Sequence, residues 1–163
     1  MPTTKEEIIQ EFTQAKERVA ALVRDTAATD WQKGVYEGGW NARQILAHIS
    51  ATDYGVTVDG VLARAKGLPA PAGSRPADVD GNTWNQRLVD ERAGRSIPEL
   101  AAEFAAACDS GIAKLQQTAA EELSIPIPSG FGAGGPAGDL IRRVGSGHIL
   151  GHIGDIEQAL RAG

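Results

Sequence analysis

The chain has 163 residues, of which 42% are hydrophobic and 23% are charged, an ordinary composition for a globular domain. Its net charge of −5, with acidic and basic residues mixed along the chain, argues against nucleic acids and anionic membrane surfaces as partners, because both require basic patches. No apolar run approaches the roughly 20 residues of a membrane span and no segment resembles a signal peptide, so we expect a cytoplasmic protein with one domain, residues 1–163.

A capping box predicts the first helix. A threonine at position 3 or 4 and a glutamate at position 6 or 7 have the spacing at which side chains satisfy the first free backbone N–H groups. Apolar residues then recur at helical spacing from Ile8 to Val23. We therefore expect a helix that ends near Thr26 and packs on the core, followed by a glycine-containing connection over residues 27–39.

The second predicted helix has a well-defined start. Asn41 is a favourable N-cap residue, Gln44 stands at the capping-box position, and Trp40 can form one end of a hydrophobic staple. The apolar face then runs through His48, and a glycine and a proline follow the last helical residues. We expect one continuous helix over about residues 41–66, with a histidine on its inward face.

The middle of the chain combines a long loop with two further helices. Residues 68–80 are rich in proline, alanine and glycine, and form either a loop that covers a pocket or a solvated connector. Residues 82–92 indicate a short helix, in which we interpret Trp84 as a packing residue. A third capping box opens a helix over about residues 96–117, where Cys108, the single cysteine, is expected to be buried rather than a ligand or a nucleophile.

The last part of the chain is rich in glycine. Prolines and glycines exclude a long helix from residues 125–136, which are either flexible or form an ordered wall across one end of the domain. The final helix should open at Pro136 or Asp139 and carry His148 and His152. Glycines at positions 145, 147, 151 and 154 each cost roughly 1 kcal/mol relative to alanine. Either a neighbouring backbone approaches the stripe formed by the last three, or the helix is kinked.

The predicted segments amount to four long helices, one additional short helix and long Pro/Gly-rich loops. They include no convincing strand and no internal repeat. Short-to-moderate connections between long helices favour antiparallel neighbours. The predicted fold class is therefore all-α, an antiparallel four-helix bundle.

All three histidines of the chain fall on inward faces of predicted helices. His148 and His152 are one helical turn apart, and folding would bring His48 onto the same face. Three neutral imidazoles can hold a metal and leave a position open for water, a substrate or a thiol. We predict a metal site on these residues, with purely structural buried histidines as the alternative. Ile149 stands where the zinc-protease motif would need a glutamate, which excludes that motif.

Several charged residues are candidates for supporting roles around the predicted site. Asp53, Asp155 and Glu157 are candidates to orient a histidine N–H group. Arg142 and Arg143 precede His148 by six and five residues, about one and a half helical turns. They could bind an anionic substrate or simply form a solvated helix face.

Two stretches of the sequence resemble the DinB-like superfamily, which includes the mycothiol-dependent maleylpyruvate isomerase type and the bacillithiol transferase type. Residues 40–49 are similar to the family's tryptophan, helix cap and first histidine, and His148-x-x-x-His152 is similar to its later histidine pair. The resemblance implies a four-helix bundle with a divalent metal, often zinc or nickel, on His48, His148 and His152. It also implies frequent homodimers and a low-molecular-weight thiol as cosubstrate.

From the three histidines and the resemblance we expect a metal-dependent enzyme that acts on a small molecule. The reaction we favour is S-transfer with a thiol of the mycothiol or bacillithiol type, in which the metal lowers the pKa of the thiol. A hydrolase that uses metal-bound water and a non-catalytic, stress-related metal- or ligand-binding bundle are the alternatives. The homodimer is what the resemblance implies, and from the composition we expect neither nucleic acid nor membrane as a partner.

Overall fold

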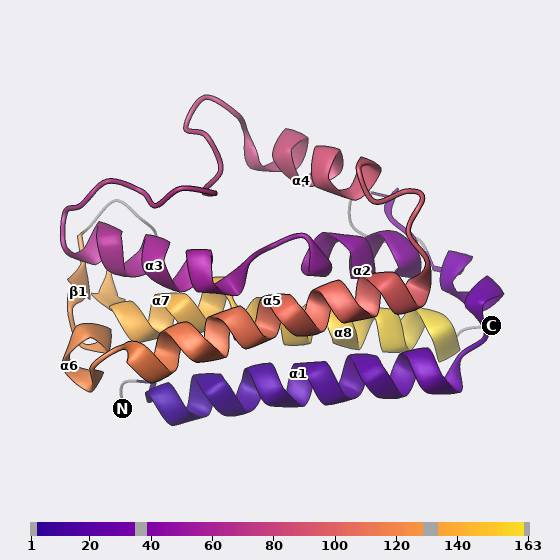
Figure 1. Cartoon of the computed structure of the whole chain (residues 1–163), viewed down its shortest axis with the longest axis horizontal. Helices are drawn as coiled ribbons and strands as arrows, with labels where there is room; N and C mark the ends of the chain where they lie inside the picture. The colour runs from indigo at the N-terminus through magenta and orange to yellow at the C-terminus, as the bar shows by residue number, and fades with distance from the viewer. Residues whose placement is uncertain (1–2, 35–38, 129–133, 162–163) are drawn as a thin grey trace.

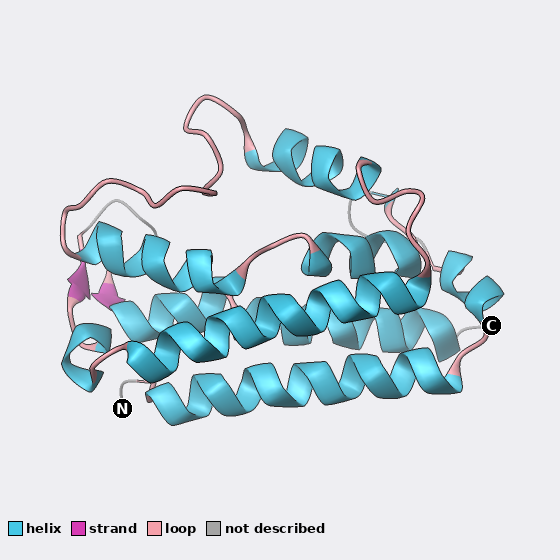
Figure 2. Ribbon diagram, in the orientation of Figure 1, coloured by secondary structure: helices cyan, strands magenta, loops and turns pink. Residues whose placement is uncertain are grey.

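The computed structural model describes residues 3–34, 39–128 and 134–161, and almost all of their regular secondary structure is helical (Figures 1 and 2). The predicted all-α class is confirmed. The elements are α1 (Lys5–Asp25), the 3-10 helix η1 (Ala28–Gln32), α2 (Ala42–Ser50), α3 (Tyr54–Ala65), α4 (Gly81–Asp90), α5 (Ile97–Gln117), α6 (Ala120–Leu123), β1 (Pro126–Ile127), β2 (Gly135–Pro136), α7 (Ala137–Val144) and α8 (Ser146–Arg161).

The bundle has four helical members (Figure 1). Two are the single helices α1 and α5, and the other two are the successive helix pairs α2–α3 and α7–α8. The helices α1 and α5 are antiparallel. Lys5 at the start of α1 donates a hydrogen bond to the Thr118 carbonyl just after α5, and Lys16 farther along α1 pairs with Asp109. The predicted four-helix bundle is confirmed. Within the described ranges, no helix is both long enough and apolar enough to cross a membrane.

A long crossover over residues 66–96 connects α3 to α5 and contains α4. The segment α2–α3 runs in the same direction as α5, because their contacts advance together along both. Ser50 lies at hydrogen-bond distance from the Leu100 carbonyl, and farther along Asp59 pairs with Lys114. The chain must therefore return to the opposite end of the bundle between α3 and α5. Figure 1 shows α4 set above the bundle on this return path.

Capping boxes define the starts of three helices, as the sequence indicates. Thr4 caps α1, Asn41 caps α2 and Ser96 caps α5, and in each case the side chain three residues later bonds back to the cap N–H. Each box satisfies two backbone donors that a helix N-terminus would otherwise leave without partners. The start of α2 is thus specified locally, two turns before His48.

The predicted second helix is interrupted between residues 50 and 54. Asp53 caps α3, since its Oδ1 accepts from the N–H groups of Gly55 at 2.9 Å and Val56 at 3.3 Å. Ser50 Oγ lies 2.6 Å from the Leu46 carbonyl, another side-chain bond to the backbone. Such side chains offer the backbone an alternative to the regular helical ladder. The expectation of one continuous helix over residues 41–66 is therefore wrong.

The last predicted helix is also divided, at Gly145, whose φ of −109° and ψ of −105° are not helical. This is the kink that the sequence analysis offered as an alternative to close helix contact. A Cβ added at Gly151 or Gly154 would meet nothing within 4 Å, so no neighbouring backbone approaches the stripe at these two positions. A Cβ at Gly147 would lie 2.9 Å from the carbonyl oxygen of Arg142, which belongs to α7, the segment just before the break. Gly151 and Gly154 lower the helix propensity of α8 without enabling a contact.

The ends of the predicted irregular segment 125–136 pair with each other. Pro126 lies opposite Pro136 and Ile127 opposite Gly135 in a two-residue antiparallel ladder, which the sequence did not indicate. The ladder joins the chain after α6 to the start of α7. Residues 129–133, between the two strands, lie outside the described residues, so the choice between a flexible segment and an ordered wall stays open for them.

The core is centred on Phe12 of α1, which is fully buried. Its ring centroid lies 5.5 Å from that of Tyr54 in α3. A Cβ built at Gly111 in α5 would lie 3.4 Å from two ring carbons of Phe12 and only 2.9 Å from Tyr54 Cβ. A Cβ built at Gly145 would also lie 3.4 Å from the Phe12 ring. Gly111, which weakens the helix on propensity alone, therefore allows α1, α3 and α5 to pack closely.

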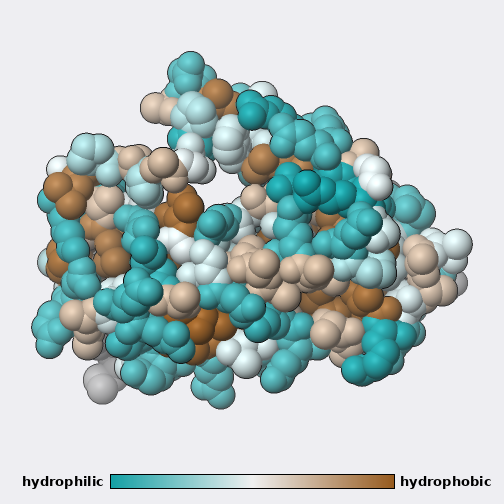
Figure 3. Space-filling view, in the orientation of Figure 1, coloured by the Kyte–Doolittle hydropathy of each residue, from teal (hydrophilic) through white to brown (hydrophobic). Residues whose placement is uncertain are grey.

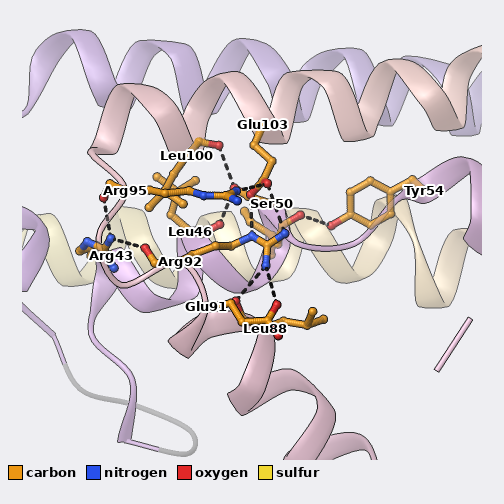
Figure 4. A network of polar contacts seen from close by, with 11 residues as sticks. Arg43, Leu46, Ser50, Tyr54, Leu88, Glu91, Arg92, Arg95, Leu100 and Glu103 are labelled. Atoms are coloured by element: carbon orange, nitrogen blue, oxygen red, sulfur yellow. Dashed lines mark hydrogen bonds and ion pairs between the residues drawn. The ribbon is translucent and has the colours of Figure 1, made fainter. Parts of the chain in front are cut away.

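A polar network ties the end of the crossover to α2 and α5 (Figure 4). Arg43 of α2 donates through Nη2 to the carbonyls of Arg92 at 2.7 Å, Ala93 at 3.1 Å and Arg95 at 2.6 Å. Glu103 of α5 accepts from the guanidinium groups of both Arg92 and Arg95. These bonds satisfy several carbonyl groups of the turn after α4 and hold that turn against the first part of α2.

Two glycine-to-alanine substitutions should change stability in opposite directions. We expect Gly111→Ala to destabilise the protein by about 1–3 kcal/mol, because the added methyl group overpacks the contact with Tyr54. Gly154→Ala should stabilise it by about 1 kcal/mol, because the helix gains propensity and the methyl group meets nothing. Urea unfolding of both variants tests this. Stabilisation by both would show that α3 and α5 do not need the glycine.

Candidate metal centre

His48 lies in the second turn of α2 and is only 8% exposed. The Trp40 ring covers it, with the two ring centroids 5.0 Å apart. Burial, and next the charges of His152 and His148, lower the pKa of His48 to about 4. The imidazole is therefore neutral at neutral pH, the protonation state in which a histidine binds a metal.

The two other histidines project from α8 toward His48. The Nε2 atoms of His148 and His152 are 3.1 Å apart, as expected for residues separated by one helical turn. Their ring centroids lie 5.8 Å and 5.0 Å from the centroid of His48. His148 is exposed and His152 partly exposed, so the cluster is closed on the α2 side and open on another. The structure thus brings together all three histidines named from the sequence.

The geometry of the three rings fits one metal ion. One candidate ligand atom from each residue lies within 4.8 Å of the other two. Zinc-type ions bind imidazole nitrogen at about 2.0–2.1 Å, so two nitrogens on a tetrahedral ion lie about 3.3 Å apart. The α8 pair already has this spacing, and the third ring would have to close by at most about 1.5 Å. Imidazole donors suit zinc, nickel, copper or iron, and not magnesium or calcium.

Contacts with α1 hold α8 in the required position. Glu11 of α1 accepts from Arg142 in α7 at 2.9 Å and from Ser146, the first residue of α8, also at 2.9 Å. Glu11 therefore bridges the break at Gly145. Farther along, Arg18 of α1 pairs with Glu157 of α8. Together these bonds fix the two helix segments on either side of the α8 histidines.

A pocket of about 880 Å³ opens beside the histidines and is lined by His48 and His148. Its walls come from α3, α7, α4 and the loop over residues 68–75. Figure 3 shows the molecule hollowed between α4 and the bundle, with hydrophobic residues at the edge of the hollow. Of the two interpretations of the loop, a cover over a pocket is the one that agrees with the structure. Trp84 also lines this pocket, so its role is not packing alone.

Other residues named from the sequence are occupied elsewhere. Asp53 caps α3 and accepts a 2.7 Å hydrogen bond from Ser110, and Glu157 pairs with Arg18. Asp155 is exposed on α8. Cys108 is fully buried and burial raises the pKa of its thiol to about 12, which confirms that it is a packing residue.

Trp40 has a second role that its sequence context does not reveal. Its indole N–H donates to Gln86 of α4 at 2.9 Å while its ring covers His48. The tryptophan therefore connects the crossover to the candidate metal ligand. The position of Trp40 directly before the helix cap was the one sequence signal for such a role. A hydrophobic staple accounts for that position equally well. The contact with Gln86 depends on the path of a crossover that the local pattern does not specify.

The stability of the metal-free protein should depend on pH through His48. Unfolded histidine has a pKa of about 6.5, whereas that of folded His48 is about 4, so only the unfolded chain binds the proton between these values. The part of the unfolding free energy that depends on neutral His48 is fully present above about pH 6.5 and is lost as the pH falls toward 4. Urea midpoints of chelator-treated protein should therefore decrease over this range.

The matched control for this dependence is His48→Gln, which cannot titrate. Its urea midpoint should change less between about pH 7 and pH 5 than that of the unmodified protein. Carboxyl groups with lowered pKa values, such as those of Asp80 and Asp139, lose their contributions mainly at lower pH and are common to both proteins. Identical pH dependence in the two proteins would contradict the assignment to His48.

Comparison with solved structures supports the fold. An uncharacterised protein from Clostridium difficile 630 is 17% identical, with a TM-score of 0.70 over 97% of this chain and 96% of that one. The colibactin self-resistance protein ClbS, solved in complex with a dsDNA, is 12% identical, with a TM-score of 0.69 over 98% and 96%. A mutant of mycothiol-dependent maleylpyruvate isomerase is 11% identical, with a TM-score of 0.65 over 94% of this chain and 61% of that one.

Comparison with sequence families identifies the relationship more directly. A search of curated proteins finds no match to this chain. The model of the mycothiol maleylpyruvate isomerase N-terminal domain matches residues 12–144, a segment that contains His48 and ends just before the α8 histidines. This match covers most of the sequence and agrees with the helical architecture. The chain therefore belongs to the mycothiol maleylpyruvate isomerase N-terminal domain family, within the DinB-like superfamily.

Proposed function

We propose that this protein is a metal-dependent S-transferase that joins a low-molecular-weight thiol to a small electrophile. The observation that carries the proposal is the convergence of three imidazoles from α2 and α8 at the edge of a pocket of about 880 Å³. Membership of a family named for a mycothiol-dependent enzyme favours a thiol of the mycothiol or bacillithiol type. The proposed ligands are His48, His148 and His152, and zinc or nickel is the proposed metal.

The residues of the chain itself orient the proposed metal ligands and remove part of the water from the pocket. His48 is kept neutral by burial, and Trp40 restricts the orientation of its ring. The crossover and α4 cover the pocket and exclude part of the water around the reacting groups. A divalent cation bound to the three histidines would lower the pKa of a thiol and so supply thiolate at neutral pH. The thiol sulfur would then bond to the electrophilic carbon, whose leaving group departs with the bonding electron pair.

The pocket is less suited to hydrolysis. Asp53 is the carboxylate among the described residues that line it, and its Oδ1 already accepts hydrogen bonds from the α3 N-terminus and from Ser110. A hydrolase needs a group that takes a proton from water, and this carboxylate is committed to holding backbone and hydroxyl groups. We place the nucleophile on the cosubstrate thiol because Cys108, the single cysteine of the chain, is buried and its pKa is raised to about 12.

Several partner expectations stay predictions. We expect a homodimer and a cytoplasmic location, and we expect the chain not to bind nucleic acid because its net charge is −5. The complex of ClbS with dsDNA means that a protein of this fold can bind DNA. An electrophoretic shift assay with duplex DNA at low salt is therefore a necessary companion to the enzymatic tests.

Metal content should depend on each histidine. We expect about one zinc or nickel ion per chain in protein purified without a histidine tag. Inductively coupled plasma mass spectrometry measures this metal content. His48→Ala, His148→Ala or His152→Ala should each reduce this by at least about tenfold, because a site with three ligands loses a third of its donors. Gln158→Ala, on the exposed face of α8, is the matched control. Metal content unchanged in all three histidine variants would disprove the site.

Turnover should require both the metal and a thiol. We expect metal-loaded protein to conjugate mycothiol or bacillithiol to 1-chloro-2,4-dinitrobenzene faster than the spontaneous reaction, and His152→Ala to abolish the difference. Cys108→Ala should keep the activity, since its thiol is un-ionised at neutral pH. Ester cleavage without a thiol would indicate the hydrolase instead. Metal binding with no turnover across a broad panel of thiols and electrophiles would favour a non-catalytic bundle.

A further inference from the structure

The pocket beside the histidines is unusually cationic for an acidic protein. Arg64, Arg75 and Arg143 line it, and Asp53 is the acidic residue among the described lining residues. The carboxylate of Asp53 is engaged by the N-terminus of α3 and by Ser110. The chain as a whole has 21 acidic and 16 basic residues, so the excess of positive charge in this pocket reverses the overall balance. Such a wall raises the local concentration of anions.

The neighbouring arginines of α7 have different surroundings. Arg142 forms a close ion pair with Glu11 and helps to hold α7 and α8 against α1. Arg143 lines the pocket, and no hydrogen bond or ion pair engages its guanidinium in the part of the chain that the structure describes. Arg75 donates to the Val79 carbonyl within the loop. Of the two α7 arginines, Arg143 is thus the one available to a ligand.

The same pocket has a large apolar surface. Leu68 and Val144, the exposed large hydrophobic residues of the described chain at 59% and 43% exposure, both line it. Trp84 and Leu88 face it from α4, and Leu140 from α7. An exposed apolar patch rimmed by charge is typical of a ligand-binding surface. A small hydrophilic anion would leave this patch in contact with water.

We propose that this pocket binds an amphipathic organic anion, an aromatic or aliphatic carboxylic acid, with its apolar body between α4 and α7 and its carboxylate on Arg143. Arg64 and Arg75 also line the pocket. This inference rests on the proposed function, because the acid is the electrophilic reactant that meets the thiol beside the histidines. It goes further by naming the chemical class of that reactant and the residue that recognises it.

Binding to metal-free protein tests the recognition without any catalysis. Isothermal titration with 2-naphthoate should show affinity at least about tenfold higher than for neutral 2-naphthalenemethanol and for hydrophilic succinate. Arg143→Gln should weaken 2-naphthoate binding about three- to tenfold, as expected for one partly solvated charged contact. Trp84→Ala should weaken it by a similar factor. Arg24→Gln, an exposed arginine on α1 beyond the pocket lining, removes the same charge and should leave the affinity unchanged.

A kinetic pair separates this inference from the proposed function. The metal-loaded protein is given thiol with 4-chloro-3,5-dinitrobenzoate or with neutral 1-chloro-2,4-dinitrobenzene. A lower KM for the acid, raised by Arg143→Gln for the acid alone, supports the inference. Turnover of both substrates with no preference for the acid overturns it and leaves the proposed function intact. Absence of turnover with tight naphthoate binding contradicts the transferase and retains the anion site. Absence of naphthoate binding to folded protein also overturns the inference.

Discussion

The packing of α2 against α8 is the constraint on which the rest of the candidate site depends. It places a buried, neutral imidazole opposite two imidazoles that one helical turn holds 3.1 Å apart. Two of the three candidate ligands are thus positioned by the backbone of one helix, and only the distance between the helices remains to be set. The ion pairs of α1 with α7 and α8 and the buried core around Phe12 set that distance.

The path of the chain places a pocket beside this cluster. Because α2–α3 and α5 run in the same direction, the chain must cross back over the bundle between them. The crossover forms, together with α3 and α7, a pocket beside His48 and His148 that has apolar and cationic walls. Trp40 connects the two parts, since its ring contacts His48 and its N–H group binds α4. Trp40 therefore links the position of α4 to the environment of the His48 ring.

The accuracy of the sequence-based predictions depended on how local each determinant was. The starts at Thr4, Asn41 and Ser96 were predictable because a capping box is complete within four residues. The breaks after Ser50 and at Gly145 were harder, because apolar periodicity continues across both. Asp53 and Ser50 are residues that favour such a break, but only the packed structure shows that their side chains bind the backbone.

The sequence by itself determined the helical class, most helix starts and the three histidines that could share a metal, because periodicity, capping and residue chemistry are local properties. Only the tertiary structure decided which way the helices run, that Arg143 lines the pocket while Arg142 pairs with Glu11, and that Gly111 sits at a close helix contact while Gly154 does not. The physical reason is that two adjacent arginines, or two helical glycines, differ only in the residues that pack against them. Those packing residues are distant in the sequence, so the local pattern does not specify them.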